Sequence, residues 1–562
     1  MRRFPSILFR SLAFELLKLL ASATAAIVCV LAFGAAIKPL ADGEIGPDDT
    51  VRIMAFAIIP MLQFALPFSS AFAATLTYHR FSSENEADAA MVSGIPHRTL
   101  LAPAIVVGIV LGLGISALMT SVIPNFLREM ESIITRNVSE ILIARVERGE
   151  CIVVGNFQIY AESAQSVGPD PILPDGSGTG AFERLVLSGV LAVQSSDNAN
   201  AQTAINAEQV FMWFFDDSDE TGNAIAVQLV FDKAASFDSS TRMTTIVERL
   251  NSQRIRIPGQ FRNKPKFLTG AELRVIKREP ERMNYIETTR RVLAMRIAQH
   301  RTIDELDAQL RTSGAVEFGQ GAGRVVRVAS RGIEQTDGGW RLLPVRAGRG
   351  VRFSVSLEDG SERLYTAISA ELVLVSDEGR WKGGDWTNTY TIEARNLTLD
   401  SDSSDADAIA NTLGDYAFAR LTPKEPPEDE LLAMSSAALL TMAAQGEDNL
   451  GGAVQREAKL LQKRLKYLRN KILSKQHERY AYAVSSMIMV ISGAVVGFKM
   501  RDSLPLVVYL WSFFPAMITF LSISTGRQFV EDSGAAALPL LWAGTVFIAA
   551  FTAYEFVRLR RH

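Results

Sequence analysis

Residues 99–127 read TLLAPAIVVGIVLGLGISALMTSVIPNFL and contain no charged side chain. A helix of this length can cross the apolar core of a bilayer, which takes roughly 20 residues. Five other uncharged runs are long enough to do the same, at 19–37, 53–78, 480–498, 503–526 and 533–554. The sequence therefore predicts a helical membrane protein with six spans, at 19–37, 53–78, 99–123, 480–498, 503–525 and 534–556.

A stretch of ordinary soluble composition, residues 128–479, separates the third run from the fourth. We therefore expect an N-terminal membrane half, a β-rich domain, a helical linker and a C-terminal membrane half, at 1–127, 128–425, 426–479 and 480–562. With 58 Lys and Arg against 61 Asp and Glu, the net charge is -3. The whole chain thus lacks the basic field that holds nucleic acid, and we expect no nucleic acid partner.

The first apolar run has two interpretations. Arg2, Arg3 and Arg10 precede it, as they would precede the core of a cleaved signal peptide. However, Lys18 is followed by 19 uncharged residues, which is longer than a typical signal-peptide core, and no clear small-residue cleavage site lies before Lys38. An uncleaved span fits this pattern better.

Basic residues near the predicted spans are unevenly distributed. The loops on one side carry Lys38, Arg52 and Arg527, whereas the side that holds both termini carries eleven: Arg2, Arg3, Arg10, Lys18, Arg80, Arg98, Lys499, Arg501, Arg558, Arg560 and Arg561. By the positive-inside rule, both termini face the cytoplasm and the large soluble region faces the other way. The basic segment 456–479 argues for the reverse orientation, but long domains largely escape this rule.

The soluble region shows mainly β patterning. Its clearest alternation places Val351, Phe353, Val355 and Leu357 on one face with polar residues between them, which is typical of a half-buried strand. Further strands are predicted at 152–160, 185–193, 210–215, 224–231 and 365–375, which favours an antiparallel sandwich or open roll. A helical pattern at 282–312 divides this region, either into two lobes or as an insertion in one sheet.

An amphipathic helix is predicted before the fourth span. Leu461, Leu465, Leu468 and Ile472 recur at spacings of four, three and four among many Lys and Arg residues. This helix is either a solvated connection or a basic face held close to the membrane. In the second case, anionic lipid head groups or phosphates could bind there.

The sequence offers no motif for catalysis. Cys29 lies in the first span and Cys151 in the soluble region, so we expect no disulfide between them. No G-x-x-x-x-G-K-[ST] loop and no CxxC pair occurs, and none of the five His residues stands at metal-ligand spacing. We therefore expect no catalytic residue, no metal and no cofactor, and a membrane enzyme is the weakest candidate function.

The loop between the second and third spans carries the sharpest local pattern. Ser83 and Glu86 have the spacing of a capping box, which predicts that a short helix begins there. Gly94 suits the left-handed position that ends a helix and Pro96 prevents continuation, so the helix is expected over 83–93. It is either an ordinary capped loop helix or, with its acidic start, a docking element.

Five short motifs occur at defined places in this order of spans: Asp42-Gly43-Glu44-Ile45, Leu66-Pro67-Phe68, Arg80-Phe81-Ser82-Ser83-Glu84-Asn85-Glu86, Ser93-Gly94-Ile95 and His477-Glu478-Arg479. Together with that order, they resemble the LptF/LptG (YjgP/YjgQ) lipopolysaccharide-export permease family. The resemblance covers about 1–160 and 425–562. The soluble region between the two membrane halves is longer than the single β-jellyroll of that family requires.

The resemblance implies a non-catalytic permease subunit of an ABC-type lipid exporter in the bacterial inner membrane. In that family two permeases pair around a cavity, and a cytoplasmic ATPase dimer powers the extraction of lipopolysaccharide. The lipid then passes through periplasmic jellyroll domains toward a bridge to the outer membrane. The implied partners are thus an ABC ATPase dimer, a second permease subunit, a lipid substrate and a periplasmic bridge protein, and the β-rich domain is expected to be periplasmic and jellyroll-like.

The resemblance also implies functional residues. The loop helix would be the coupling helix that contacts the ATPase, with Glu84, Glu86, Asp88 and Gly94 as its site residues. Glu86, eight residues before Gly94, matches the acidic ATPase contact of the family.

Spans one and five line the lateral opening of the cavity in that family. The matching candidates for lipid contact are Lys38, Arg52 and Pro515, and a proline in the middle of span five is expected to bend the helix. Lys38 can equally extend to its own head-group layer. Gly108 and Gly112 in span three have the spacing of a close helix contact.

A second function, from another class, is a mechanotransmitting or sensory membrane protein whose outer domain acts on a protein partner. Such assemblies commonly place one span before the domain, whereas this chain is predicted to place three there. The order of spans therefore favours lipid export.

Overall fold

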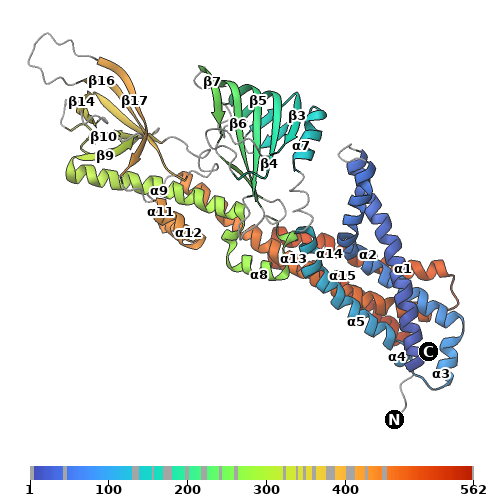
Figure 1. Cartoon of the computed structure of the whole chain (residues 1–562). Coiled ribbons are helices and arrows are strands. Elements are labelled where there is room, and N and C mark those ends of the chain that lie inside the picture. Colours follow the sequence, from blue (N-terminus) through green and yellow to red (C-terminus); the bar gives the residue numbers. More distant parts are fainter. Residues whose placement is uncertain are drawn as a thin grey trace, which may run out of the picture. The chain divides into compact units, whose positions relative to one another are not determined.

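The computed structural model of the chain divides into two compact units, which are described separately. The first comprises Met1–Val138, Gly259–Glu279 and Lys466–His562, and the second Ser139–Pro258 and Pro280–Leu465. Figure 1 labels their helices and strands. The structure describes residues 6–41, 47–128, 138–154, 157–168, 180–195, 202–216, 224–238, 243–252, 254–258, 264–320, 324–336, 339–345, 350–356, 362–374, 386–399, 412–424, 428–445 and 452–559.

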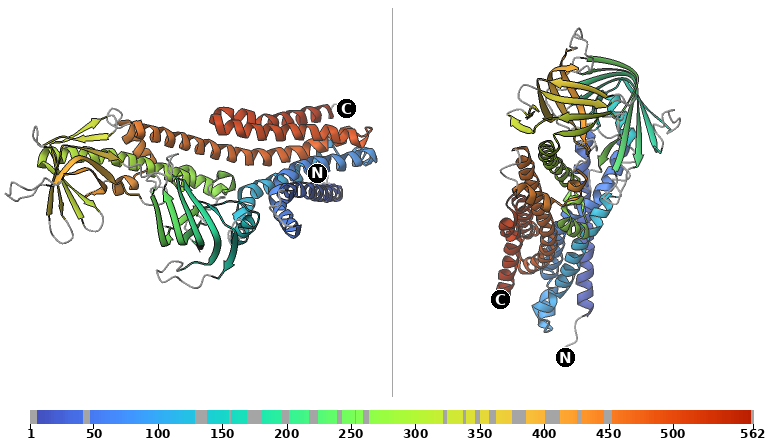
Figure 2. Two further views of the ribbon diagram at one scale, coloured as in Figure 1. Left: turned by 90° about the horizontal axis from the view of Figure 1, so that it is seen from above. Right: turned by 90° about the vertical axis from the view of Figure 1, so that its left-hand side faces the viewer.

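The first unit is built mainly from long apolar helices. Its elements are α1 (Ser6–Ala41), α2 (Pro47–Ser83), α3 (Glu86–Val92), α4 (His97–Leu100), α5 (Ala102–Ala117), the π-helical turn η1 (Leu118–Val122), the 3-10 turn η2 (Pro265–Phe267), α8 (Gly270–Arg278), most of α13 (Gly452–Lys499), α14 (Pro505–Ser533), the 3-10 turn η4 (Gly534–Ala537) and α15 (Leu538–Leu559). Figure 2 shows α14 and α15 side by side, in the red colours of the C-terminal end of the chain.

Within the described residues, five helical segments are long and apolar enough to cross a membrane: Ser6–Gly34, Met54–Ser83, His97–Arg128, Gly452–Lys499 and Leu506–Leu559. Each of the six predicted runs overlaps one of them. The last segment holds both α14 and α15, which reverse direction at η4. Gly526 accordingly lies against Leu541, and Gly544 lies against Thr519, so the two helices pack antiparallel.

Glycines allow the helices of this unit to approach closely. A Cβ atom added at Gly112 would lie 3.0 Å from the backbone oxygen of Ala483, and Gly108 makes the same kind of contact with α13. The predicted close contact of this pair is therefore confirmed. The structure adds a second contact, because a Cβ atom at Gly497 would lie 2.4 Å from the backbone oxygen of Thr75. Small residues of this kind support helix packing in membranes, where lipid is as apolar as the helices.

The first β region is an antiparallel sheet of eight strands, preceded by α7 (Val138–Glu147). Its strands are β1 (Ile152–Val154), β2 (Phe157–Tyr160), β3 (Ser163–Val167), β4 (Glu183–Ser195), β5 (Gln202–Asp216), β6 (Ala224–Asp238), β7 (Met243–Asn251) and β8 (Ile255–Pro258). They pair in the order β1-β2-β4-β5-β6-β7, with β3 on β4 and β8 on β6. Leu185, Met212 and Leu229 lie opposite one another on the three long strands and are fully buried, so they form one row of the core.

These pairings establish an open antiparallel meander among the described residues, with no pairing between β1 and β7. The long central strands appear side by side in Figure 1. A jellyroll is not established by this order of strands.

The second β region has nine strands, and six of them close into a barrel. The strands are β9 (Ala315–Gln320), β10 (Arg324–Ala329), β11 (Ile333–Thr336), β12 (Gly339–Leu342), β13 (Val351–Ser356), β14 (Glu362–Ala367), β15 (Ser369–Leu374), β16 (Tyr390–Leu399) and β17 (Thr412–Pro423). The ring runs β16-β14-β13-β10-β9-β17 and returns to β16, while β15, β12 and β11 continue outward from β16. Phe353 and Phe418 stack at 4.8 Å between ring centres inside it.

A long helix covers this barrel. α9 (Asn284–Ser313) buries Ile303, Leu306 and Leu310 in the same core as the strands, and α11 (Glu428–Ala433) and α12 (Ser436–Gln445) contact α9. The helix predicted at 282–312 is therefore confirmed. The strand predicted from residue 351 is also confirmed, since Val351 and Phe353 are fully buried, although Leu357 lies outside the described residues.

Candidate functional site

The loop between α2 and α5 begins with a turn that differs from the prediction. α2 continues to Ser83, and the Ser83 hydroxyl donates to the backbone oxygen of Arg80 at 3.1 Å within the last turn of that helix. The chain then turns through Asn85, whose φ of 59° is left-handed, and α3 begins at Glu86 without a side-chain cap. The predicted capping box of Ser83 and Glu86 is therefore wrong, because an N-cap residue needs an extended backbone and Ser83 is helical.

The end of α3 follows the prediction. Gly94 has a φ of 81°, its amide donates to the oxygen of Met91 at 2.8 Å, and the amide of Ile95 donates to the oxygen of Ala90 at 3.1 Å. This pair of bonds is a Schellman motif, in which glycine occupies the left-handed position without steric cost. Pro96 is extended and separates α3 from α4. Gly94 thus determines where the loop helix ends.

A buried face anchors α3 to the helix bundle. Ala87 is 1% exposed and belongs to a core cluster that also contains Leu100 and Phe498. The Tyr78 hydroxyl donates to the backbone oxygen of Leu100 at 3.0 Å. The position of α3 is therefore coupled to the ends of α2, α5 and α13.

The three acidic residues predicted at this site have different surroundings. Glu84 accepts from Arg80 at 2.8 Å, and Asp88 accepts from Arg501 at 2.6 Å. Glu86 is exposed and makes no ion pair within the described part of the chain. Both pairs lie at the surface and contribute little to stability. Their effect is to occupy Glu84 and Asp88, which leaves Glu86 as the carboxylate available to a partner.

Apolar surface lies next to Glu86 on the outward face of α3. Val92 is 89% exposed, and Ala89 is exposed between them. Residues three positions apart share one face of a helix, so Glu86, Ala89 and Val92 form a single strip. We call these three residues the α3 strip. It offers one negative charge and one exposed aliphatic side chain to a partner.

The partners of the acidic residues have little signal in the sequence. Arg501 lies 413 positions after its partner Asp88. Glu15 contacts Arg80 at 3.3 Å and lies 65 positions before it. Periodicity can place Asp88 on a helix, but only the packing of α3 beside the α13–α14 loop brings Arg501 to it. The sequence shows only that Arg501 is a basic residue in a short loop between two apolar runs.

The three candidate lipid contacts are placed as follows. Lys38 lies in α1 and Arg52 in α2, but their side chains are outside the described residues. Pro515 is buried inside α14, which continues as helix on both sides of it. The backbone oxygen of Pro515 accepts from the Thr519 hydroxyl at 2.8 Å.

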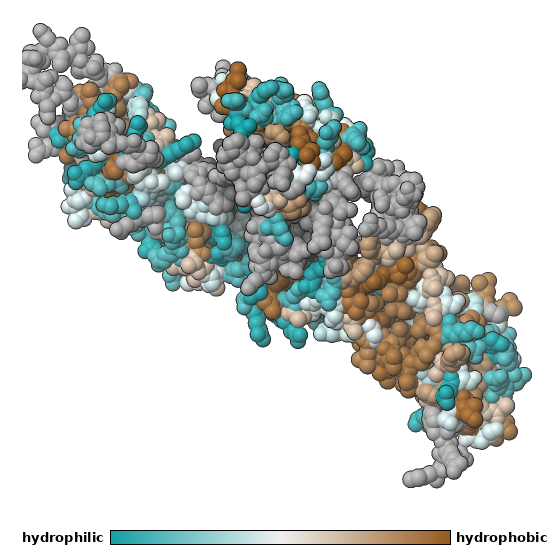
Figure 3. All heavy atoms as spheres, viewed as in Figure 1, coloured by the Kyte–Doolittle hydropathy of each residue, from teal (hydrophilic) through white to brown (hydrophobic). Residues whose placement is uncertain are grey.

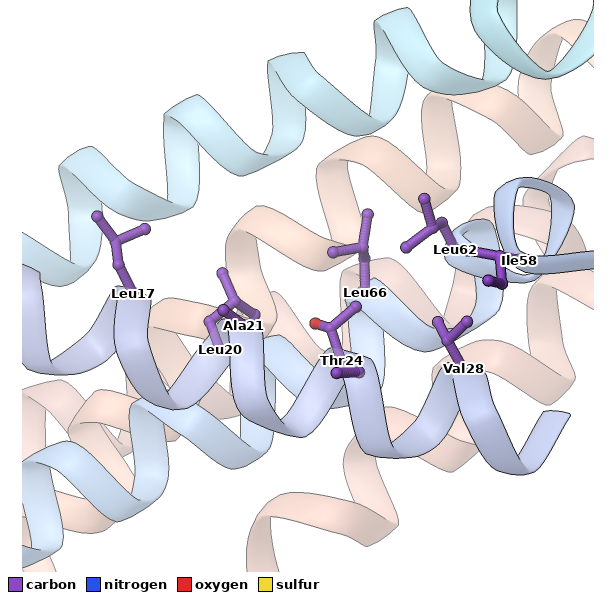
Figure 4. Close-up of a pocket in the computed structure, with 9 residues that line it drawn as sticks. Leu17, Leu20, Ala21, Thr24, Val28, Ile58, Leu62 and Leu66 are labelled. Carbon is purple, nitrogen blue, oxygen red and sulfur yellow. The ribbon is translucent and has the colours of Figure 1, made fainter. Parts of the chain in front are cut away.

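An apolar pocket lies between α1 and α2, and Figure 4 shows its lining side chains on these two helices. Its volume is about 400 Å³, and the lining residues are Leu17, Leu20, Ala21, Thr24, Ala25, Val28, Ile58, Leu62 and Leu66. Apart from the hydroxyl of Thr24, this lining is aliphatic. Such a surface suits a hydrocarbon chain and not a polar ligand.

Apolar side chains also cover much of the outside of the helix bundle, as the brown region of Figure 3 shows. Phe14 on α1, Val110 on α5 and Leu506 on α14 are 72%, 63% and 72% exposed. Monomeric soluble proteins rarely expose such a continuous apolar surface. The bundle therefore presents a surface suited to lipid.

Residues 9–236 match the family model described as Lipopolysaccharide export system permease LptF/LptG. This match supports the LptF/LptG family for that stretch of the chain. Among the curated proteins, none matches the chain. The matched stretch runs from α1 into β6 and therefore includes the α3 strip and most of the first β region. The family that matches implies a multi-pass inner-membrane permease for lipopolysaccharide export, a transport subunit that acts with other Lpt components.

This match changes the extent of the resemblance. The motifs indicated about 1–160 and 425–562, whereas the match continues through β4 and β5 and ends at residue 236. Most of the first β region thus falls within the matched stretch, while β7 and β8 lie after it. The second β region, from β9 to β17, and the C-terminal helices lie beyond the matched residues.

Proposed function

We propose that this chain is the permease subunit of an ATP-driven lipid exporter. It extracts lipopolysaccharide or a related lipid from the inner membrane and passes that lipid to its β domain. The observation that carries this proposal is the α3 strip, which presents Glu86 and Val92 on a helix anchored to the bundle through Ala87. The match to the LptF/LptG family over residues 9–236 supports it.

In the proposed mechanism, an ABC ATPase dimer binds the α3 strip. Motion of the ATPase moves α3, and the buried contacts of Ala87 with the cluster around Leu100 and Phe498 transmit that motion to the long helices. A second permease subunit, identical or paralogous, completes the cavity. The pocket between α1 and α2 accommodates an acyl chain, while Lys38 and Arg52 contact the lipid phosphate and Pro515 allows α14 to bend.

The proposed topology has six crossings, with both termini in the cytoplasm. α14 and α15 contain 29 and 22 residues, and at 1.5 Å per residue each is long enough to span a hydrocarbon core of roughly 30 Å. Arg80, Lys499 and Arg501 lie at the end of the bundle that holds α3, which agrees with the positive-inside rule. The β regions are then periplasmic, and the eight-stranded sheet is the proposed jellyroll that receives lipid and meets a bridge protein.

Charge reversal at Glu86 tests the coupling role. Glu86→Lys should abolish co-purification of the ATPase and reduce lipid export at least tenfold, because an attractive contact becomes repulsive. The chain should still insert, since Glu86 is exposed and the anchoring residue Ala87 is unchanged. Glu279→Lys, an exposed acidic position at the end of α8, is the matched control. Normal ATPase binding and normal export in the Glu86 variant would rule out the coupling role.

The alternative of a mechanotransmitting or sensory protein predicts a different outer contact. A photo-crosslinker placed on the buried face of the eight-stranded sheet should form lipid adducts during export and only protein adducts during signal transmission. Within the described ranges, no three His, Cys, Asp or Glu side chains approach closely enough to hold a metal ion.

A further inference from the structure

A group of cations lies where three apolar helices end. The uncharged run of α5 and η1 stops at Arg128, that of α13 begins after Arg479, and that of α14 stops before Arg527. The short segment 264–279, with η2 and α8, belongs to the same unit as these helix ends. In the sequence, this segment lies within the predicted β-rich domain, 128–425.

Two contacts hold the segment against these helix ends. Arg479 donates to the backbone oxygen of Leu268 at 2.6 Å, and Arg128 pairs with Glu272 at 2.7 Å. Glu272 also completes the capping box that begins α8. Lys266 is therefore held near α13, because Leu268, two residues further along the chain, accepts the hydrogen bond from Arg479.

α13 presents a basic face at this place. Lys471, Lys475 and Arg479 are spaced four apart and therefore lie on one side of the helix. Glu478 is 6% exposed, and both of its oxygens are occupied, Oε2 by Lys475 and Oε1 by Arg527. Since that carboxylate is fully used, the other cations need a different source of negative charge.

The remaining lysines contact neutral groups. The Nζ atom of Lys266 lies 4.5 Å from the centre of the Phe267 ring, and that of Lys471 donates to the Tyr467 hydroxyl at 2.9 Å. These contacts orient the two ammonium groups without neutralising them. Glu531 is the other carboxylate that acts on Lys475, so the positive charges still outnumber the negative ones.

Two guanidinium groups in this place have buried N–H groups without an acceptor. Arg479 is 5% exposed, and its Nη1 has no hydrogen-bond partner among the described residues, nor does the Nε of Arg527. Buried donors of this kind are costly unless an acceptor binds them. The crowding of charge agrees with this, because the pKa of Lys266 is lowered by partial burial and then by four neighbouring cations: Lys264, Lys475, Lys471 and Arg527.

We propose that these residues bind the phosphate group of an anion at the membrane edge. We call the site the cationic cluster; it consists of Lys264, Lys266, Lys471, Lys475, Arg479 and Arg527. A phosphate group accepts several N–H bonds at once, and Arg and Lys are its usual partners in proteins. The apolar runs 480–498 and 503–526 border the cluster, so a lipid head group reaches it without leaving the bilayer. The proposal does not depend on ATPase docking at α3.

Native mass spectrometry of the full chain in neutral detergent tests this site. Phosphatidylglycerol or phosphatidylcholine is added, and the affinity of each is measured, with and without inorganic phosphate as a competitor. Lys264→Gln combined with Lys266→Gln removes two exposed cations of the cluster, and Lys277→Gln on the exposed end of α8 is the matched control. Thermal unfolding without added lipid verifies that each variant folds like the parent chain.

The double variant should bind phosphatidylglycerol about tenfold more weakly, since a charge-assisted hydrogen bond contributes roughly one order of magnitude. Binding of phosphatidylcholine, and binding by Lys277→Gln, should not change. Displacement of phosphatidylglycerol by inorganic phosphate would assign the site to phosphate from either source, and resistance to displacement would assign it to the phosphate of a lipid. Equal phosphatidylglycerol affinity in the double variant and the parent chain would overturn the proposal.

Discussion

Glu428, the first residue of α11, is a buried carboxyl whose charge is poorly compensated. It is 4% exposed, its Oε1 accepts from the amide of Asn388 at 3.4 Å, and its Oε2 has no partner among the described residues. Desolvation by this burial raises the pKa of Glu428. The folded state therefore favours the protonated carboxyl, and the ionised form lowers stability at neutral pH.

Replacing this carboxyl by an amide should stabilise the second unit at neutral and alkaline pH. The pKa of Glu428 in the folded state lies above the ordinary value of 4.5, so the cost of ionisation is absent at lower pH and grows as the pH rises through the folded pKa. Glu428→Gln removes this cost, so its Tm should match that of the parent chain near about pH 4 and exceed it near about pH 8. Thermal unfolding across this range checks the prediction. Glu430→Gln, with a 60% exposed side chain, is the control, and identical pH profiles for Glu428→Gln and the parent would contradict it.

The close approach of α13 to α2 gives a prediction at Gly497. A Cβ atom there would lie 2.4 Å from the backbone oxygen of Thr75, so Gly497→Val has to separate the two helices. Overpacking of this kind costs about 1–3 kcal/mol, and a lower unfolding temperature in mild detergent should report it. Gly114→Val on α5 is the matched control, since nothing lies within 4 Å of its added Cβ atom. Equal stability of the two variants would show that this contact is not a tight one.

One residue-scale prediction from the sequence was wrong for a clear reason. Ser83 with Glu86 and Thr269 with Glu272 share the capping-box spacing, yet only the second pair forms the box. Thr269 is extended, with φ -66° and ψ 164°, whereas the Ser83 hydroxyl bonds to Arg80 inside α2. The four-residue pattern does not say whether the preceding helix has already ended, and that depends on packing.

At the scale of elements, local sequence patterns predicted those helices and strands whose formation depends on neighbouring residues in the chain. The apolar helices followed from uncharged length alone, and β13 followed from alternation, with Val351 and Phe353 inside. β16 and β17 escaped prediction because left-handed residues, Asn396 with φ 50° and Arg420 with φ 56°, interrupt their alternation. The closing pair of the barrel joins Thr422 to Gly319, and no short window of sequence contains that contact.

The segment with α8 shows the same limit. Its capping box and its buried Leu273 and Ile276 were readable as an amphipathic helix. Its membership of the membrane unit depends on Arg128 and Arg479, which are distant in sequence. The sequence predicts a basic face before the fourth span as one of two alternatives, but its neighbours in the segment with α8 and on α14 follow only from the fold.

At the scale of the whole molecule, the structure shows which elements make the soluble region longer than a single β-jellyroll requires. The LptF/LptG match ends within β6, and the chain then returns to the first unit at Gly259–Glu279 before it enters α9. α9, the closed barrel, α11 and α12 therefore form an insertion between α8 and α13. The family match covers β1 to β5 and most of β6, whereas the barrel lies entirely outside it.

The proposed orientation of the whole chain makes its own prediction. Val92 on α3 is 89% exposed and should be cytoplasmic, while Ile246 on β7 is 81% exposed and should be periplasmic. In a background with Cys29→Ala and Cys151→Ser, a membrane-impermeant maleimide added to spheroplasts should label Ile246→Cys at once, but should label Val92→Cys only after lysis. Both substitutions lie at exposed positions, so neither should disturb packing. Labelling of Val92→Cys in intact spheroplasts, with protection of Ile246→Cys, would invert the topology and move the α3 strip out of reach of any cytoplasmic ATPase.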